Sequence, residues 1–276
     1  MQLIGSLALN VLLLQSWVPI QASYFSYNAP SWSISTELFF YCAFPLLIRS
    51  FSTTWYWKLA GVVVVLATLI AASNLLGLPE SSVYGVSAHG LMYVGPLSRI
   101  VEFITGMCCC LLWRSVEKRA ADGGVVIFTI LETLVIAFAC WFFAHSYRIS
   151  IPGMGIAGDV WSGNTWMSPA FLLIVFVFAF GRGLFSSMLL STKVAVFLGE
   201  ISFALYLIHV WVIGACRAAF DVSSTGATFG IALAASLAAA AGIHLLVEAP
   251  GRRIVRRKLN AYAENRKSHM VPLSQR

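Results

Sequence analysis

The sequence predicts an all-α fold, a polytopic membrane helix bundle of about eight transmembrane helices. Of the 276 residues, 59% are hydrophobic and only 11% are charged, whereas about a quarter of the residues in soluble domains are charged. Apolar runs approach the roughly 20 residues that a helix needs to cross a bilayer, and they recur along the whole chain. Backbone groups in hydrocarbon must be satisfied within their own segment, so these runs are expected to be helices.

Eight apolar segments are expected to cross the membrane, with boundaries uncertain by a few residues at each end. In chain order they are Leu3–Trp17, Glu37–Ile48, Leu59–Leu76, Leu91–Trp113, Val125–Ala144, Pro169–Phe180, Ala195–Cys216 and Thr228–Val247. The second and sixth segments are short, and we expect their flanks to extend them.

The basic residues predict how these helices are oriented. When the connecting segments alternate between the two sides, 15 of the 18 Lys and Arg residues fall on one side and two fall on the other. Loops rich in Lys and Arg stay in the cytoplasm. We therefore expect a multi-pass protein of the inner (plasma) membrane with both termini cytoplasmic. The segments Pro79–Gly90 and Ser146–Ser168 are then loops on the outer side.

The C-terminal part differs in composition from the rest of the chain. We expect a membrane bundle over residues 1–248 and a basic cytoplasmic tail over residues 249–276, with Pro250 stopping the last helix. Much of the net charge of +7 lies in this tail. It indicates topology signalling and contact with the lipid bilayer, with binding of anionic lipids as a secondary role. No nucleic-acid partner is expected.

The cysteines do not predict a metal site. Cys108, Cys109 and Cys110 are consecutive in an expected helix, so they face different directions and cannot converge on one ion. The other three stand alone in apolar surroundings and are typical of small buried hydrophobes. We also find no phosphate-cradling glycine loop, zincin motif or serine-hydrolase elbow, so neither a metal nor a bound cofactor is expected.

Glu37 is the first candidate site residue, because it stands directly before the apolar run Leu38–Ile48. A carboxylate near hydrocarbon is costly unless it is paired, hydrogen-bonded or protonated, so acids in membrane segments are functional candidates. The alternative is a negative charge that only stabilises a helix N-terminus. We expect Glu37 to line a cavity with the helix of Arg99 and Glu102, or with the helix of His209.

Further polar residues lie at helical spacing. Arg99 and Glu102 are three apart, on one helix face, and form either a structural pair or a substrate contact. Ser202, Tyr206 and His209 form a polar stripe at i, i+4 and i+7, which serves either packing or binding. Near the cytoplasmic rim, a His and a Glu four apart are expected to act with the following arginines as a structural anchor; these are His244, Glu248, Arg252 and Arg253.

Four stretches resemble acyltransferase family 3, in the order in which that family carries them. They are Pro-Ser-Trp-Ser-Ile-Ser-Thr-Glu at residues 30–37, Arg-Ile-Val-Glu-Phe-Ile-Thr-Gly at 99–106, Leu-Gly-Glu-Ile-Ser-Phe-Ala-Leu-Tyr-Leu-Ile-His at 198–209, and Val-Glu-Ala-Pro-Gly-Arg-Arg at 247–253. Any one of them is a weak signal, and the four together are specific.

The resemblance implies a membrane O-acyltransferase. Such an enzyme transfers an acyl group, typically acetyl from acetyl-CoA, to a hydroxyl of a cell-surface or exported carbohydrate, as in O-acetylation of polysaccharide or modification of lipopolysaccharide. The partners would be acyl-CoA and a carbohydrate acceptor, and the implied catalytic residue is Glu37. The implied substrate-binding residues are Ser31, Trp32, Ser33, Arg99, Glu102, Tyr206 and His209.

One feature of the family cannot be found. Its members usually have ten helices, and the first carries a His that is held to be catalytic, whereas no His precedes His89 in this chain. We therefore expect an N-terminally truncated member with little or no transferase activity by itself. If the chain is active, its general base must come from Glu37, His209 or His244.

Two other classes remain open. An inactive remnant or membrane scaffold would show the same bundle without binding a donor. A carrier of lipid-linked sugar would also place charges in the membrane, but it should show internal repeats and matching broken helices, which the sequence lacks.

Overall fold

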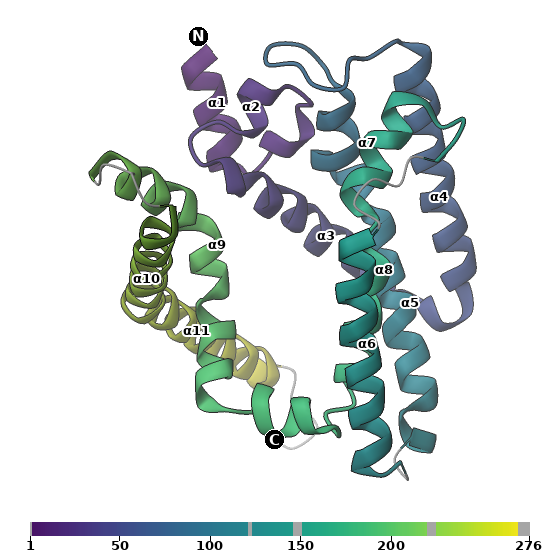
Figure 1. Ribbon diagram of the computed structural model, residues 1–276, viewed down its shortest axis with the longest axis vertical. Coiled ribbons are helices and arrows are strands. Elements are labelled where there is room, and N and C mark those ends of the chain that lie inside the picture. The colour runs from purple at the N-terminus through teal and green to yellow at the C-terminus, as the bar shows by residue number, and fades with distance from the viewer. Residues whose placement is uncertain (1, 121–122, 146–150, 220–224, 270–276) are drawn as a thin grey trace. The chain divides into compact units, whose positions relative to one another are not determined.

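The computed structural model describes residues 2–120, 123–145, 151–219 and 225–269, and this part of the chain is built from helices without a strand (Figure 1). The all-α prediction is confirmed. Seven helical stretches of the described residues are long and apolar enough to cross a membrane. They are Ala29–Ile48, Phe51–Leu75, Gly90–Ala120, Val125–His145, Gly155–Phe178, Lys193–Ala219 and Phe229–Tyr262.

The helices form two compact units, Met1–Thr192 and Lys193–Arg276. The α-helices of the first unit are α1 (Gln2–Val11), α2 (Gln21–Tyr24), α3 (Trp32–Ile48), α4 (Phe51–Leu75), α5 (Pro96–Ala120), α6 (Val125–His145), α7 (Gly155–Thr165) and α8 (Ser168–Phe178). Its shorter turns are η1 (Gln15–Trp17), η2 (Ala29–Ser31), η3 (Gly90–Val94) and η4 (Phe185–Leu190). The second unit contains α9 (Lys193–Ala219), α10 (Thr225–Ile243), η5 (His244–Glu248) and α11 (Ala249–His269).

The first predicted span, Leu3–Trp17, is not one helix. α1 ends at Val11, and Leu13 adopts a positive φ of 55°, which a continuous α-helix cannot contain. A helix of ten residues is about 15 Å long, half of the hydrocarbon thickness. The described residues therefore provide seven spans where we predicted eight. An odd number of spans ends on the opposite side of the membrane from where it begins, so these seven spans do not fit the prediction that both termini are cytoplasmic.

Hydroxyl groups of α3 explain this break. The Ser35 hydroxyl donates to the backbone oxygen of Leu13 at 2.6 Å and lies 2.6 Å from the hydroxyl of Ser16. On the next position, the Thr36 hydroxyl donates to the backbone oxygen of Val94 at 3.1 Å. Both side chains are buried. α3 starts at Trp32, five residues before the start that we predicted at Glu37. Through these two hydroxyls it connects the residues before it to the turn that precedes α5.

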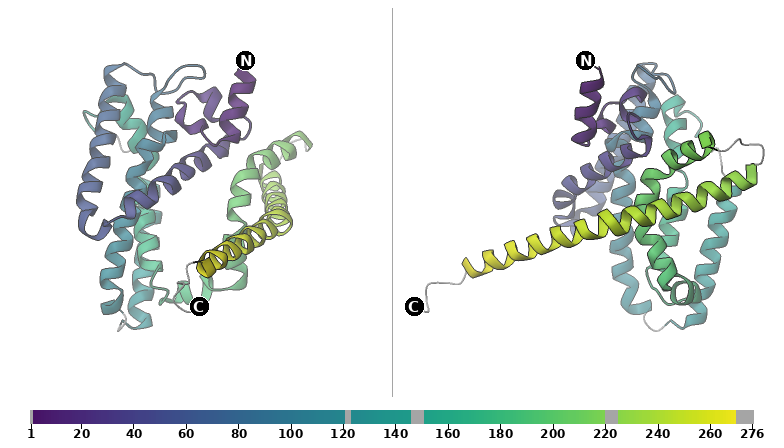
Figure 2. Two further views of the ribbon diagram at one scale, coloured as in Figure 1. Left: turned by 180° about the vertical axis from the view of Figure 1, so that it is seen from behind. Right: turned by 90° about the vertical axis from the view of Figure 1, so that its left-hand side faces the viewer.

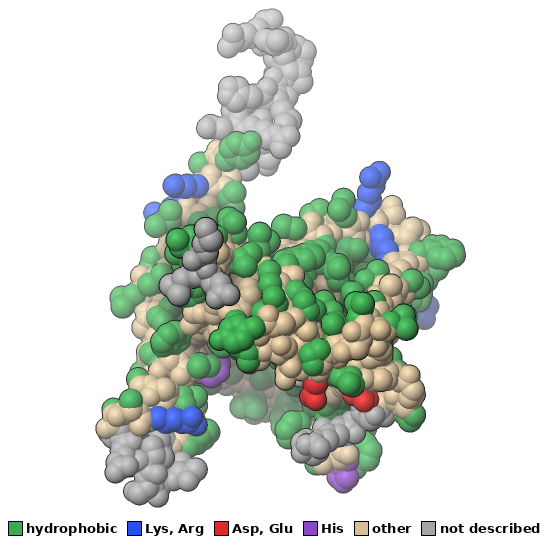
Figure 3. Space-filling model, turned by 90° about the horizontal axis from the view of Figure 1, so that it is seen from above, with side chains coloured by type: hydrophobic (Ala, Val, Ile, Leu, Met, Phe, Trp, Pro, Cys, Tyr) green, Lys and Arg blue, Asp and Glu red, His purple; other side chains and the backbone are tan. Residues whose placement is uncertain are grey.

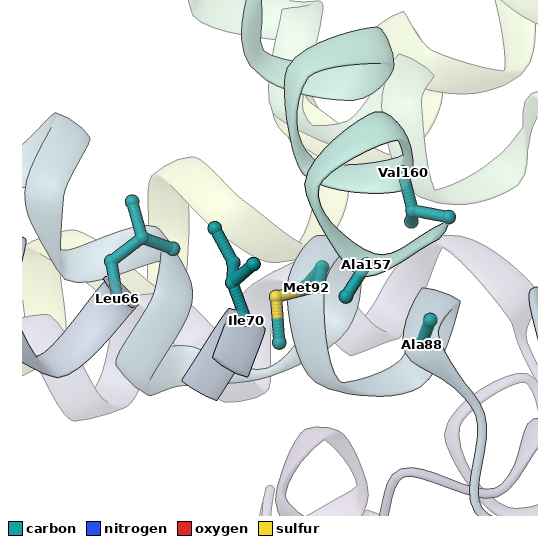
Figure 4. Close-up of a cluster of buried hydrophobic side chains, with 6 residues drawn as sticks. All are labelled: Leu66, Ile70, Ala88, Met92, Ala157 and Val160. Carbon is teal, nitrogen blue, oxygen red and sulfur yellow. The ribbon is translucent and has the colours of Figure 1, made fainter. Parts of the chain in front are cut away.

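The core of the first unit lies where α4 meets η3, α5 and α7. One side of α4 is buried at i, i+4 and i+8, by Val62, Leu66 and Ile70. Figure 4 shows the cluster made by Leu66, Ile70, Ala88, Met92, Ala157 and Val160. In a membrane such contacts stabilise mainly through close packing, because lipid is as apolar as the side chains.

α7 occupies part of the predicted outer loop Ser146–Ser168. The side-chain amide of Asn74, at the end of α4, donates to the backbone oxygen of Met154 at 2.7 Å and accepts from the backbone N–H of Ala157 at 3.1 Å. This contact caps the first turn of α7 from a residue about 80 positions earlier. Gly155 has a φ of +65°, and a Cβ there would lie 2.7 Å from the Asn74 amide, so glycine is required.

A buried carboxylate joins α6 to the segment after α8. Glu132 is 1% exposed. Its Oε1 accepts from the Ser186 hydroxyl at 2.5 Å, and its Oε2 accepts from the Phe185 N–H at 3.0 Å. A Cβ on Gly183 would lie 2.1 Å from the same Oε2. The space around the carboxylate is therefore filled by protein, and Glu132 acts as a structural latch.

In the second unit, α9 packs against α10 through Ile201, Ala204 and Ala240, and small residues of this kind allow close helix approach in membranes. α10, η5 and α11 form one continuous helix (Figure 2). The prediction that Pro250 stops the helix is wrong. A proline clashes with the carbonyl four residues earlier, and here that carbonyl belongs to η5, a wider π-turn that makes room for the ring.

The surface of the described helices is largely apolar, as the face in Figure 3 shows. On α4, Val64 exposes 63% of its surface and Leu75 exposes 88%. Apolar surface of this extent marks an interaction site in a soluble protein, and here it fits contact with hydrocarbon. The helices and their surface agree with a multi-pass membrane protein.

The predicted orientation can be tested with single cysteines placed in a variant whose six native cysteines are replaced by alanine. Tyr84 is 80% exposed between α4 and η3, and Lys118 lies in the last turn of α5. In intact cells, a membrane-impermeant maleimide should label Tyr84→Cys, and it should label Lys118→Cys only after permeabilisation. Equal labelling of the two positions in intact cells would contradict this orientation.

Replacing Glu132 by leucine should destabilise the protein by about 1–3 kcal/mol, because the N–H of Phe185 would lose its acceptor in an apolar environment. Glu132→Gln keeps one acceptor oxygen and should cost less. The measurement is unfolding in detergent with increasing SDS. Glu117→Leu, on the exposed part of α5, is the control and should change stability by about 0.5 kcal/mol or less. Equal stability of all variants would show that the latch has no energetic role.

Candidate functional site

A cluster of polar side chains lies between α5 and α8 in the first unit. Nη1 of Arg99 lies 2.9 Å from Oε1 of Glu102, and the Ser168 hydroxyl donates to the same oxygen at 3.2 Å. The predicted pairing of Arg99 with Glu102 is confirmed. About a fifth of each charged side chain remains exposed, 22% and 21%. The pair therefore reduces the cost of both charges in the bundle and still leaves the carboxylate accessible.

Aromatic rings connect this pair to the Pro-Ser-Trp-Ser stretch. The guanidinium of Arg99 lies 5.5 Å from the ring centre of Tyr93, a distance at which a cation is attracted to a ring face. The Tyr93 ring lies 4.9 Å from the ring of Trp32, which is 9% exposed. Trp32 thus packs beside the residue that holds Arg99.

Two cavities flank α5, and Glu102 lines both. The first has a volume of about 690 Å³ and lies between α3, the start of α4 and α5; we name it the α3–α5 cavity. The second, the α5–α8 cavity, has a volume of about 590 Å³. Gly106 and Cys110 also line both. A Cβ on Gly106 would meet no atom within 4 Å, so the helix surface is open at the level of the carboxylate.

Glu37 is half-buried on α3, and its carboxylate accepts a hydrogen bond from the hydroxyl of Tyr41, one turn further along the same helix. Neither cavity beside Glu102 is lined by Glu37. Because α3 begins at Trp32, Glu37 lies in the second turn of the helix and is not its first residue. The structure therefore does not bring Glu37 into either of these cavities with Glu102.

The hydroxyls of Ser31 and Ser33 bind backbone oxygens of the residues that lead into α3. The Ser31 hydroxyl donates to the backbone oxygen of Asn28 at 2.6 Å, and the amide of the buried Gln15 donates to the backbone oxygen of Ser31 at 3.0 Å. The Ser33 hydroxyl donates to the backbone oxygen of Pro30 at 3.0 Å. Side-chain hydroxyls that bind neighbouring backbone in this way stabilise turns and helix starts.

Tyr206 and His209 line one groove in the second unit, as their spacing predicts. The groove lies between α9 and α10, has a volume of about 590 Å³, and includes Ser202, Arg217 and Ser236. Nδ1 of His209 lies 2.7 Å from the backbone oxygen of Tyr206. In the neutral ring this contact places the N–H on Nδ1 and leaves the lone pair on Nε2.

His244 is buried and held by carboxylates of the second unit. Its Nδ1 lies 3.1 Å from Oε2 of Glu248, and its Nε2 lies 3.8 Å from Oε2 of Glu200. Glu248 also pairs with Arg252. The expected anchor of His244, Glu248 and Arg252 is therefore present, and Glu200, which lies in the Leu-Gly-Glu-Ile-Ser stretch, extends it.

Sequence reasoning missed two buried polar sites in the first unit. Glu132 is, like Glu37, an acid beside apolar residues of a predicted membrane helix, and this pattern marks it as a candidate site residue by the same argument. His89 has its Nδ1 3.1 Å from the hydroxyl of the buried Tyr24. Burial lowers the pKa of His89, although the charge of Glu80 opposes this shift. Burial raises the pKa of Tyr24, with an opposing contribution from its hydrogen bond to Ser87.

Within the described residues, no group of three or more His, Cys, Asp or Glu side chains is arranged to hold a metal ion. The chemistry that the described side chains offer is that of carboxylates, imidazoles and guanidinium groups. These groups can position a hydroxyl, accept its proton and bind an anion.

Comparison with known proteins adds the family. The family described as "Acyltransferase domain" matches residues 3–245. The chain is similar to the acyltransferase MdmB of Streptomyces mycarofaciens, with 28% identity over 268 residues, which cover 90% of this chain and 64% of that protein. The chain thus spans less than two thirds of the length of this relative. No solved structure matches this chain. Because the family match extends over nearly all of the apolar helices, the chain belongs to acyltransferase family 3, as the four stretches indicate.

Proposed function

We propose that the protein is a membrane acyltransferase that transfers an acyl group, acetyl in the first instance, from acyl-CoA to a hydroxyl of a cell-surface or exported carbohydrate. Membership of the family and the similarity to an acyltransferase support the transfer reaction. The observation that carries the proposal is the carboxylate of Glu102, paired with Arg99 and open to two cavities of an apolar bundle.

The reaction joins a donor from the cytoplasm to an acceptor that faces the outside. The hydroxyl oxygen of the acceptor attacks the carbonyl carbon of the thioester, the carbon–sulfur bond breaks, and CoA leaves as the thiol after receiving a proton. A general base must accept the hydroxyl proton. Two cavities on neighbouring faces of one helix, sharing one carboxylate, would allow the two substrates to approach each other within the bundle.

Each site residue receives a role in this proposal. Glu102 accepts a hydrogen bond from the acceptor hydroxyl, orients it and accepts its proton, and Arg99 pairs with the carboxylate. In the second unit, His209 is assigned a contact to a substrate hydroxyl within its own groove, because its Nδ1 contact leaves Nε2 as a proton acceptor there. Glu37 lies outside both cavities with its carboxylate bound by the Tyr41 hydroxyl, and it stays a candidate site residue through its place in the Pro-Ser-Trp-Ser-Ile-Ser-Thr-Glu stretch.

Glu102→Gln should lower acylation at least tenfold, because the neutral amide holds the acceptor less well and leaves Arg99 without its ion pair. Cells that express the chain are grown with radiolabelled acetate, and the label released by mild base from purified envelope polysaccharide is measured. The low activity expected from the missing His is contrary to this proposal, so the wild type must first release more label than cells without the chain. Glu117→Gln, on the exposed part of α5, is the matched control and should act as the wild type. Glu37→Gln should also reduce acylation. Wild-type levels in Glu102→Gln would exclude this carboxylate from the site.

His209→Ala should lower acylation by about tenfold or more, because the groove of the second unit would lose the proton acceptor at Nε2. His145→Ala is a closely matched control, because Nδ1 of His145 also contacts a backbone oxygen of its own helix, that of Trp141 at 2.8 Å, in an exposed position. The same released-acetate assay applies. Similar losses in the two variants, or none in His209→Ala, would exclude His209 from substrate contact.

A further inference from the structure

A second, basic cleft lies at the turn between α3 and α4, next to the α3–α5 cavity. It has a volume of about 430 Å³. We name it the turn cleft; it is lined by Leu46, Arg49, Ser50, Thr54, Trp57 and Lys58. Ser50, which adopts a positive φ of 52° at this turn, lines both the turn cleft and the α3–α5 cavity. The two spaces are therefore neighbours around a single residue.

We infer that the turn cleft and the α3–α5 cavity together form the binding site for the acyl-CoA donor. The phosphates and the adenine would occupy the turn cleft and its rim, the pantetheine arm would lie along α5, and the thioester would reach Glu102. This inference rests on the proposed function and extends it, because it assigns one of the two cavities flanking α5 to the donor and leaves the α5–α8 cavity to the acceptor.

The charges of the cleft fit a polyanion. Arg49 lines the turn cleft and Arg114 lines the α3–α5 cavity, and neither guanidinium has an acidic partner among the described residues. Lys58 is positioned by the backbone oxygens of Leu47, at 2.8 Å, and Arg49. Guanidinium and ammonium groups with free donors are the usual partners of phosphate oxygens.

The aromatic side chain of the cleft fits a nucleotide base. Trp57 is 69% exposed beside Arg49 and Lys58, so one ring face is available. Stacking of a base on an aromatic ring contributes about 1–3 kcal/mol. An anion site with an open indole next to it is better matched to a nucleotide than to a free phosphate.

The α3–α5 cavity fits a long uncharged arm. Its walls include Phe51, Phe103 and Met107, with Arg114 toward one end and Glu102 toward the other. These two charged residues are twelve positions apart on α5, about 18 Å along the helix. An extended pantetheine arm carries amides and methylene groups without charge, so it suits apolar walls that lead from an arginine to the carboxylate.

The position of the basic residues fits the side from which acyl-CoA comes. The turn between α3 and α4 carries Arg49, and the end of α5 carries Lys118 and Arg119. The positive-inside rule assigns these ends to the cytoplasm, where acyl-CoA is made. The outer carbohydrate would not meet this end of the bundle.

An anionic phospholipid also fits a basic cleft next to an apolar cavity, because it too joins a phosphate to an apolar chain. The test therefore separates the two ligands. The full chain is placed in lipid nanodiscs of phosphatidylcholine, or of phosphatidylcholine with phosphatidylglycerol. Dissociation constants are measured for acetyl-CoA and for acetyl-pantetheine, which lacks all phosphates. The variants are Arg49→Gln, Arg114→Gln and Trp57→Ala, and Arg119→Gln is the matched control on α5. Thermal unfolding of each variant checks that it is folded.

We expect Arg49→Gln and Arg114→Gln each to raise the Kd of acetyl-CoA about tenfold and to leave the Kd of acetyl-pantetheine unchanged. Trp57→Ala should raise the Kd of acetyl-CoA by about five-fold or more, and Arg119→Gln should bind acetyl-CoA with the Kd of the wild type. Equal weakening of both ligands would indicate a structural effect and overturn the inference. Arginine variants that keep their acetyl-CoA affinity but lose sensitivity to phosphatidylglycerol would assign the site to lipid and overturn it too.

The outcome also distinguishes this inference from the proposed function. If the wild type binds acetyl-CoA and the three variants bind it equally well, the donor site lies elsewhere and the proposed function stands. If the wild type in both nanodiscs does not bind acetyl-CoA, the proposed donor is wrong and the inference fails with it.

Discussion

Polar groups inside a bundle that faces hydrocarbon must find their partners within the protein, and this constraint organises the structure. Ser35 and Thr36 on α3 satisfy it by binding the backbone of Leu13 and Val94. These two bonds connect α3 to segments on both sides of it in the chain. Water would compete for such groups in a soluble protein, whereas in a bilayer the alternative is an unsatisfied donor. Short polar side chains therefore decide where the helices of the first unit meet.

The acids of the first unit separate into two classes by the same constraint. Glu132 is enclosed, with two donors on its oxygens and no room even for a Cβ on Gly183. Glu102 forms an ion pair with Arg99 and accepts a hydrogen bond from Ser168, yet it borders two cavities. A carboxylate without space around it can only stabilise, whereas one beside open space can also contact a ligand. The open space beside the carboxylate therefore distinguishes Glu102, the candidate site residue, from the enclosed Glu132.

The proposed site combines a paired carboxylate with open space beside it. Its carboxylate is tolerable in the bundle because Arg99 neutralises it, and Arg99 is in turn held against Tyr93 and, through that ring, beside Trp32. The Trp32 ring of the Pro-Ser-Trp-Ser stretch therefore lies beside the ring that contacts Arg99. The basic turn after α3 supplies charges without acidic partners in the described residues, at the end of the bundle where a polyanionic donor would enter.

The sequence by itself determined the features that depend on local pattern. Apolar runs predicted seven of the membrane helices, and only the uncharged run at the start of the chain, Leu3–Trp17, did not form one. The three-residue spacing of Arg99 and Glu102 placed them on one helix face, and the spacing of Tyr206 and His209 placed them on one side of α9. The four family stretches also needed no structure, because they are read from residue identity.

Only the tertiary structure decided the features that depend on partners distant in the chain. The break after α1 involves Ser35, the cap of α7 comes from Asn74 about 80 residues earlier, and the latch of Glu132 depends on donors more than 50 residues later. Glu37 showed the strongest signal in the sequence, yet it lies outside both cavities beside Glu102. Helical periodicity predicts which residues share a face, but the space in front of that face is set by the helices that pack there. For this reason the sequence could name Glu37 and Glu102 as candidates, and only the fold shows that Glu102, and not Glu37, borders the two cavities.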